Sequence, residues 1–274
     1  MSVDTDNFYV IIRLYIPISE RKNFHMQEYV MGNGAIALGA LAAGVNLVAG
    51  YPGTPSSEIL ETISKYRHDG VYIEWSVNEK AAMEVAAAAA YSGARAMVTM
   101  KQVGLNVAAD PLMSLAYVGV KGGMVIVSAD DPGPISSQTE QDTRRFADFC
   151  RIPVFDPSSP EEAYKMIGEA FEYSEKYNTP VLFRPTTRVC HAYASIDNCD
   201  SPSPKKYEGF VKDSKKWVIF PRLSFANHIM IEKRNVEIGK DFSTYSANKA
   251  EGVNSEKTVV TSGISYAYTK ECLK

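Results

Sequence analysis

A carboxylate stands at the start of an alanine-rich helix in the stretch Trp75–Asn106, WSVNEKAAMEVAAAAAYSGARAMVTMKQVGLN. Glu79 opens this expected helix and Gly93 ends it, since glycine readily takes the positive φ found after helix ends. The run Ala86–Ala90 has so little side-chain bulk that a backbone or a ligand can approach closely. Such a carboxylate could act as an acid–base group. It could also simply favour the positive end of the helix dipole, which contributes roughly 0.3–1 kcal/mol.

A second carboxylate, Glu84, competes with Glu79 for the catalytic role. Glu84 lies four positions after Lys80, which is the spacing of ion pairs on a helix surface. If one of the two carboxylates is an acid–base group, we therefore expect it to be Glu79, and we expect Glu84 to pair with Lys80 at the surface.

Four polar or glycine-containing segments follow expected strands. In a parallel sheet the carboxyl ends of the strands meet at one edge, and ligands bind beyond that edge. The pattern of strands and helices therefore predicts that these segments line a common site. The segments are 50–54, 78–79, 101–106 and 129–133.

Short apolar runs alternate with helical segments from Met26 onward. The runs are continuous rather than alternating in polarity, which is typical of a parallel sheet buried on both faces. The sequence thus predicts an α/β fold with six parallel strands and helices on both faces. The expected strands are 45–49, 71–75, 96–100, 123–128, 152–155 and 180–184, and the expected helices are 35–43, 55–67, 79–92, 107–118, 138–149 and one starting after Ser159.

Two of these helices have recognisable start signals. Thr54 is expected to be an N-cap with Pro55 at the first helical position, where its missing N–H costs nothing. Ser159 and Glu162 have the spacing of a capping box.

The chain divides into four parts by composition. Residues 1–25 are an atypical N-terminal extension, and residues 26–200 form the α/β domain. Residues 201–256 are expected to be a linker, lysine-rich at its start, with a short helix at about 225–233. Residues 257–274 are expected to begin a second α/β domain, with a strand at 259–261 and a helix after Gly263.

Composition excludes several classes of protein. The net charge of −3 favours neither nucleic acid nor a membrane surface as a partner. No apolar run approaches the ~20 residues of a membrane span, and no signal peptide is recognisable, so a cytoplasmic location is expected. The four histidines are scattered, and none of the four cysteines forms a C-x-x-C pair. We therefore expect neither a zinc site nor an iron–sulfur cluster in this chain, and no other metal site.

Four motifs together resemble the 2-oxoacid:ferredoxin oxidoreductases, which use thiamine diphosphate. The most specific likeness is to the alpha subunits of the indolepyruvate type, and it extends from about Met26 to the end of the chain. The motifs are Glu79 followed by Gly93, Thr99 and Gly104-Leu105, then GYPGTPSSEI at 50–59, KQVGLNVAADP at 101–111 and TSGISYAY at 261–268.

The resemblance implies a role for each candidate site residue. Glu79 would contact the ring nitrogen of the cofactor's aminopyrimidine and exchange a proton with it, in a pyrimidine-binding domain of the thiamine diphosphate fold. Thr54, besides being an expected N-cap, would contact the substrate carboxylate. The other implied cofactor contacts are Pro52, Gly53, Val103 and Gly104, and the other implied substrate contacts are Lys101 and Asn106.

Two positions depart from the pattern of pyruvate-using relatives. Lys101 replaces a small hydroxyl residue, and it would bind a carboxylate or phosphate unless it is a solvated loop lysine. Asp130 stands near where those relatives tend to carry an arginine for the substrate carboxylate, which argues against pyruvate. Arg144 and Arg145 lie either on a solvated helix face or against a partner domain.

The resemblance also implies a larger assembly. The diphosphate, its Mg²⁺ and the 4Fe–4S clusters would be bound only by a part absent from this chain, so the chain alone should be inactive. The implied partners are a beta subunit, ferredoxin, coenzyme A and an aryl 2-oxoacid, in an oligomer. The alternatives are another thiamine diphosphate-dependent 2-oxoacid oxidoreductase or decarboxylase, and a non-catalytic scaffold for subunit contact.

Overall fold

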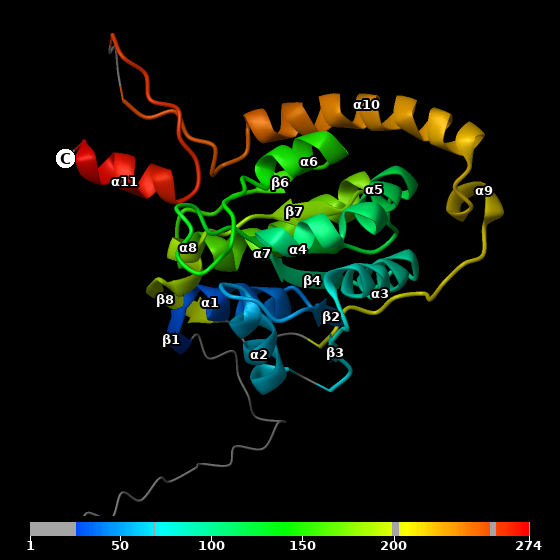
Figure 1. The fold of residues 1–274 in the computed structure, drawn as a ribbon, viewed down its shortest axis with the longest axis horizontal. Coiled ribbons are helices and arrows are strands. Elements are labelled where there is room, and N and C mark those ends of the chain that lie inside the picture. The colour runs from blue at the N-terminus through cyan, green and yellow to red at the C-terminus, as the bar shows by residue number, and fades with distance from the viewer. Residues whose placement is uncertain (1–25, 68, 199–202, 253–255, 274) are drawn as a thin grey trace, which may run out of the picture.

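A six-stranded parallel sheet forms the centre of the molecule (Figure 1). The computed structural model describes residues 26–67, 69–198, 203–252 and 256–273; the expected extension 1–25 lies outside them. The strand order β3-β2-β4-β5-β7-β6 places the carboxyl ends of all six strands at one edge. The six expected strands are therefore confirmed. They are β2 (Leu47–Gly50), β3 (Tyr72–Trp75), β4 (Ala96–Lys101), β5 (Met124–Ala129), β6 (Val154–Phe155) and β7 (Val181–Phe183).

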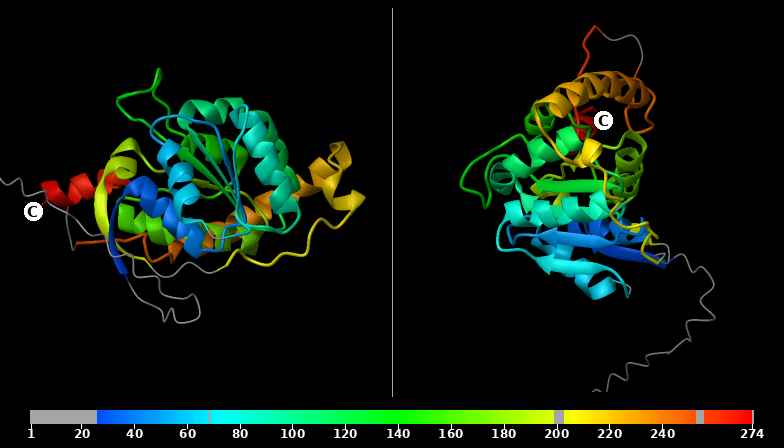
Figure 2. Two further views of the ribbon diagram at one scale, coloured as in Figure 1. Left: turned by 90° about the horizontal axis from the view of Figure 1, so that it is seen from below. Right: turned by 90° about the vertical axis from the view of Figure 1, so that its right-hand side faces the viewer.

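Helices cover both faces of this sheet, as the continuous apolar strands predict (Figure 2). Neighbouring residues of β4 point to opposite faces, since Met97 belongs to one apolar core and Val98 to the other. On one face lie α1 (Gly32–Ala42), α2 (Ser57–Tyr66) and α7 (Pro160–Tyr177). On the other face lie α3 (Glu79–Tyr91), α4 (Gln102–Val107), α5 (Ala109–Val118) and α6 (Arg144–Cys150).

The alanine run of α3 serves packing against the sheet. Ala82, Ala86 and Ala90 are fully buried in the second apolar core, together with strand residues of β4 and β5. Gly93 follows the helix with φ +91°, as expected for its end. Small side chains thus let α3 lie close to the sheet, which fixes where Glu79 emerges at the carboxyl edge.

Two strands were not expected from the sequence. β1 (Met26–Met31) and β8 (Tyr193–Asn198) form a separate antiparallel pair, which joins the first and last segments of the α/β domain. Ile196 of β8 packs with Leu38 of α1, so the pair also covers one side of that helix. The short helix α8 (Thr187–His191) precedes β8.

The predicted starts of α2 and α6 are wrong. α2 begins at Ser57 with Ser56 at the N-cap position, and Thr54 lies before it in a turn with a cis Thr54–Pro55 peptide bond. Thr54 is therefore not an N-cap. α6 begins at Arg144 rather than at residue 138, because the preceding residues are held in a loop described below.

The capping box of α7 is confirmed in one half. The Ser159 hydroxyl accepts a hydrogen bond from Glu162 N at 3.3 Å. The Glu162 carboxylate reaches back one residue further than expected and accepts from the backbone and side chain of Ser158 at 2.9 and 2.6 Å.

The stretch expected to be a linker contains more helix than the sequence predicts. α9 (Ser214–Trp217) is followed by α10 (Pro221–Ser243), which lies along α5 and α6 in Figure 1. α10 buries Ile231 and Ile238, and Asn227 donates to Tyr117 O at 2.9 Å. α11 (Ile264–Cys272) begins after Gly263 as expected, whereas residues 259–261 form no strand. No helix in the described ranges has both the length and the apolar character needed to cross a bilayer.

Candidate active site

Glu79 lies at the carboxyl edge of the sheet as the first residue of α3. Asn78 is the N-cap, and its side chain accepts from Ala81 N at 2.9 Å. Glu79 is only 8% exposed. Its carboxylate packs against Gly104 of α4, where a Cβ atom would lie 2.6 Å from Glu79 Oε1. Only glycine at position 104 leaves room for this carboxylate.

The Glu79 carboxylate receives no hydrogen bond from any described residue. A buried carboxylate normally has hydrogen-bond donors, because losing its hydration is costly. Glu79 therefore lacks a hydrogen-bond donor within the described chain. A protonated ring nitrogen of a bound cofactor could supply that donor. The buried Glu79 carboxylate and the glycine packed against it thus fit the pyrimidine ring of thiamine diphosphate.

Lys101 ends β4 and stands directly before α4. Its side chain is half-buried and lies against Gly53, where a Cβ would come within 3.1 Å of Lys101 Cδ. Within the described residues the Lys101 ammonium pairs with no carboxylate. Lys101 is therefore a half-buried lysine at the carboxyl edge of the sheet rather than a fully solvated one.

The residues after Lys101 form helix α4 rather than the expected loop. Val103 is half-buried, Gly104 is buried and Asn106 is exposed. α4 follows β4 without a break and places Gly104 next to Glu79, with Val103 one residue earlier in the same helix.

The turn between β2 and α2 brings Pro52, Gly53 and Thr54 to the same edge. Asn33 of α1 is fully buried and donates to Pro55 O at 2.7 Å and to Glu58 Oε2 at 2.9 Å. Inside the turn, the Ser56 hydroxyl donates to Gly53 O, and Gly53 N donates to the Ser57 hydroxyl, both at 2.9 Å. Pro52 and Thr54 are exposed. Asn33, which sequence reasoning missed, anchors this turn to the domain.

The rival carboxylate Glu84 is exposed on the surface of α3. The expected pair with Lys80 is not formed, because Lys80 Nζ lies 2.8 Å from Asp110 Oδ2 instead. The assignment of Glu84 to the surface holds, and its predicted partner is wrong.

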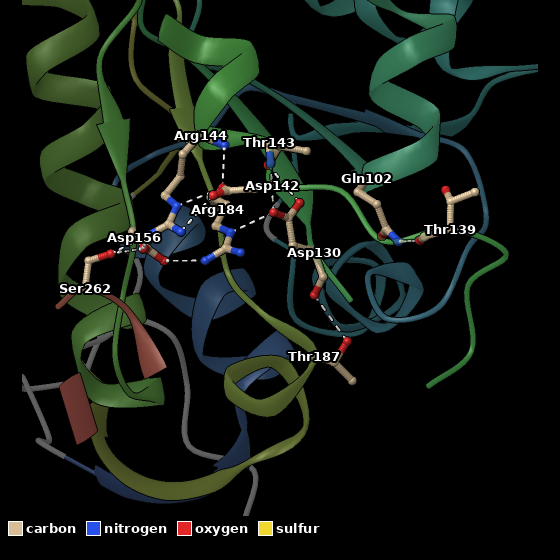
Figure 3. Close-up of polar contacts among 10 residues, drawn as sticks. All are labelled: Gln102, Asp130, Thr139, Asp142, Thr143, Arg144, Asp156, Arg184, Thr187 and Ser262. Atoms are coloured by element: carbon tan, nitrogen blue, oxygen red, sulfur yellow. Dashed lines mark hydrogen bonds and ion pairs between the residues drawn. The ribbon is translucent and has the colours of Figure 1, made fainter. Parts of the chain in front are cut away.

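Asp130 points into the domain rather than toward a substrate, and the argument against pyruvate, which rests on the missing arginine, stays a prediction. Asp130 is fully buried and accepts from Arg184 Nε at 2.7 Å, from Thr143 Oγ1 at 2.7 Å and from Thr143 N at 3.0 Å (Figure 3). It is a structural carboxylate that joins the ends of β5 and β7 to the start of α6.

The loop between β5 and α6 is tied down next to the site. Asp131 accepts from the backbone N–H groups of Ile135, Ser136 and Ser137 at 2.8–3.0 Å and from Thr187 Oγ1 at 2.8 Å. Burial raises the pKa of Asp131, but these donors outweigh it and lower the pKa below its usual value. Gln102 Nε2, at the start of α4, donates to Thr139 O at 3.0 Å.

No group of three or more histidine, cysteine or acidic side chains in the described ranges is arranged to hold a metal. Cys150 and Cys190 are buried and free, and burial raises the pKa of Cys150 to about 11. These thiols are packing residues.

Known proteins are similar to this chain in sequence and in fold. Residues 38–255 match the family described as "Pyruvate flavodoxin/ferredoxin oxidoreductase, thiamine diP-bdg". Proteins named indolepyruvate oxidoreductase subunit IorA are 45% identical in Thermococcus kodakarensis and 43% identical in Pyrococcus horikoshii, over 89% of this chain and 39% of each relative. The chain thus spans about two fifths of the length of these curated relatives.

More distant relatives agree with this match. The 2-oxoglutarate synthase subunit KorA of Methanocaldococcus jannaschii is 30% identical over 77% of this chain and 60% of its own length. The fold resembles a solved 2-oxoglutarate:ferredoxin oxidoreductase from Magnetococcus marinus, with a TM-score of 0.70 at 18% identity, covering 89% of this chain and 50% of that one. The resemblance predicted from the four motifs is confirmed: the chain belongs to the thiamine diphosphate-binding pyruvate flavodoxin/ferredoxin oxidoreductase family.

Proposed function

We propose that this chain is the pyrimidine-binding part of an oxidoreductase that oxidatively decarboxylates aryl 2-oxoacids of the indolepyruvate type, forming an acyl-coenzyme A and reducing ferredoxin. The observation that carries the proposal is Glu79, a buried carboxylate without a hydrogen-bond donor in the described chain, at the carboxyl edge of a parallel sheet. The family match and the names of the relatives support it.

The residues around Glu79 have separate tasks in this proposal. When bound, thiamine diphosphate supplies the carbon nucleophile that attacks the ketone of a 2-oxoacid. Glu79 holds a proton against the pyrimidine ring nitrogen and exchanges it as the cofactor is activated. Gly104 leaves space for the Glu79 carboxylate, and Pro52, Gly53 and Val103 would contact the cofactor.

Lys101 is proposed to receive the carboxylate of the substrate acid. Its methylene stem lies against Gly53, and its ammonium has no partner among the described residues. Thr54 and Asn106, both exposed at the same edge, would add hydrogen bonds to the substrate. An amine-to-carboxylate contact of this kind is charge-assisted and stronger than a neutral hydrogen bond.

The rest of the activity is proposed to belong to the remainder of the protein, since the chain spans 39% of the relatives' length. That remainder would hold the diphosphate, Mg²⁺ and 4Fe–4S clusters. The beta subunit, ferredoxin and coenzyme A would be its partners in an oligomeric cytoplasmic enzyme. The chain alone would be inactive.

A second candidate is a related 2-oxoacid oxidoreductase of different substrate. The similarity to a 2-oxoglutarate synthase subunit favours it, but the identity to that relative is lower than to the indolepyruvate type. A non-catalytic scaffold is disfavoured, because a protein that only mediates contact has no use for a buried carboxylate without a donor. Comparing kcat/KM for indolepyruvate, phenylpyruvate, pyruvate and 2-oxoglutarate separates the first two candidates. Pyruvate turnover equal to or better than that of the aryl acids would refute the substrate assignment.

The catalytic proposal is tested by Glu79→Gln in the full-length enzyme. Glutamine is nearly isosteric and should preserve packing against Gly104, so folding should change little. Its amide cannot exchange a proton with the ring nitrogen. Hydrogen–deuterium exchange at the reactive carbon of thiamine diphosphate should slow by roughly two to four decades, the usual worth of a positioned acid–base group.

Glu84→Gln is the matched control, because Glu84 lies on the same helix but is exposed. It should exchange at nearly the wild-type rate. Wild-type exchange in Glu79→Gln, or slow exchange in Glu84→Gln, would show that Glu79 is not the cofactor carboxylate.

A further inference from the structure

The motif TSGISYAY at 261–268 has no part in the site around Glu79, yet it makes defined contacts with the carboxyl edge of the sheet. Ser262 Oγ donates to Asp156 Oδ2 at 2.9 Å and accepts from Arg144 Nη1 at 2.6 Å (Figure 3). Asp156 follows β6, and Arg144 is the first residue of α6. One hydroxyl thus bridges an anion and a cation from two elements of the domain.

The two partners of Ser262 are themselves fixed. Asp142 accepts two hydrogen bonds from Arg144, from Nε and Nη2, both at 2.8 Å. Asp156 Oδ1 accepts from Arg184 Nη1 at 3.3 Å. Arg184 in turn holds the buried Asp130. The position of Ser262 is therefore connected through charged groups to the end of β5, next to the strand that ends in Lys101.

Gly263 contributes a second contact that depends on shape. Its φ is +54°, and a Cβ there would lie 2.5 Å from Asp156 Oδ1. Both the backbone conformation and the close approach therefore require glycine. Position 263 lets the chain turn directly over the Asp156 carboxylate and enter α11.

Helix α11 depends on such anchors. It has nine residues and none of them is buried. An isolated helix shorter than ~12–15 residues is marginal in water. A cavity of about 580 Å³ is lined both by the domain, at Phe155, and by the segment, at Tyr266. Ile264 packs on the first apolar core, directly after the Ser262–Gly263 contact.

We infer that Ser262 and Gly263 are positioning residues, which dock the segment following the α/β domain onto Asp156 and Arg144 at the carboxyl edge of the sheet. The docking sets where α11, and any chain that continues from it, begins relative to the edge that carries Glu79 and Lys101. Residues 262–263 make these contacts whatever reaction the site performs.

The test measures the distance from α11 to the domain in the full chain. Cys272, exposed at the end of α11, takes one spin label, and a cysteine replacing the exposed Glu172 of α7 takes the other, with Cys199 changed to serine. The parent should give a narrow distribution. In Ser262→Ala the ratio of docked to undocked molecules should fall by roughly tenfold or more, from the loss of hydrogen bonds to charged groups.

Two further variants decide whether the hydroxyl is responsible. Ser262→Thr keeps the hydroxyl and should restore the narrow distribution. Thr261→Val removes a neighbouring hydroxyl that has no partner among the described residues and should behave like the parent. An unchanged distribution in Ser262→Ala, an equally broad one in Ser262→Thr, or equal broadening in Thr261→Val would each overturn the inference.

Discussion

At the scale of single residues, the site consists of charged side chains packed on glycines. Glu79 lies on Gly104 and Lys101 lies on Gly53. The missing Cβ makes room for the Glu79 carboxylate at Gly104 and for the methylene stem of Lys101 at Gly53. The Glu79 carboxylate and the Lys101 ammonium thus lie at one edge of the sheet. Neither has a hydrogen-bond partner in the described chain, so both are available to ligands.

Lys101→Met tests the role of the ammonium. Methionine keeps much of the apolar stem that contacts Gly53 and removes the charge. If Lys101 binds the substrate carboxylate, kcat/KM for the 2-oxoacid in the full-length enzyme should fall by roughly ten- to a hundredfold, the worth of one hydrogen bond between charged groups. The Kd for thiamine diphosphate should stay within about twofold of the wild-type value.

Lys80→Met is the control, since Lys80 pairs with Asp110 on the surface. It should leave kcat/KM unchanged. If Lys101→Met weakens cofactor binding but does not change the KM for the 2-oxoacid, the lysine contacts the cofactor phosphate rather than the substrate.

At the scale of elements, an ion-pair group ties α7 to the opposite, amino-terminal end of the sheet. Glu175 accepts from Arg95 Nε at 2.8 Å and Nη2 at 2.9 Å, and from Lys205 Nζ at 2.7 Å. Arg95, just before β4, also donates from Nη1 to Ala43 O after α1 at 2.6 Å. The group joins a strand, two helices and the segment after β8.

This group makes stability depend on pH. Burial would raise the pKa of Glu175, but the bonds from Arg95 and Lys205 outweigh it and lower the pKa from 4.5 to about 2. A carboxylate whose pKa is lowered by folding contributes stability above its unfolded pKa and loses that contribution as the pH falls through its folded pKa. Glu175 should thus stabilise the fold above about pH 4.5 and lose this effect toward pH 2.

Glu175→Gln should lower the free energy of unfolding at pH 7 by on the order of 2 kcal/mol. Urea unfolding from pH 7 down to pH 3 should show the difference from the parent shrinking as the pH falls. Glu172→Gln, an exposed change on the same helix, should cost little at any pH. A deficit in Glu175→Gln that stays constant with pH would contradict the ion-pair explanation.

At the scale of the whole molecule, the carboxyl edge is open and has an apolar rim. Val77 is 83% exposed, and Tyr51, Trp75 and Val107 are also exposed beside the site. Exposed apolar groups gathered around a functional site are typical of a surface that another chain or domain covers. The rim agrees with a cofactor that is held from two sides.

We therefore predict that the 274-residue chain folds but binds thiamine diphosphate poorly. Without the part proposed to hold the diphosphate, several charge-assisted bonds are missing, and the Kd should exceed that of the full-length protein by at least roughly a hundredfold. Titration calorimetry of both proteins with Mg²⁺ measures the difference. Tight, Mg²⁺-dependent binding of thiamine diphosphate by this chain alone would contradict a site shared between two parts of the protein.

Local sequence patterns determined the sheet, most of its helices and the segments that follow its strands. Apolar runs identified six strands, and Glu79, Lys101 and Gly104 lie in segments that follow them. The roles predicted for these three residues come from the family resemblance. These features are predictable because burial and the βα alternation act within a few residues. The resemblance to a family added the cofactor, which no spacing by itself would have named.

Only the tertiary structure decided which polar groups meet. Asp130, Arg184, Asp156 and Ser262 are distant in the sequence, and a bare aspartate gives no sign of whether it faces a substrate or an arginine. The pairing of β1 with β8 and the length of α10 were missed for the same reason. Their stability comes from contacts with segments far along the chain, and such contacts leave no local pattern to read.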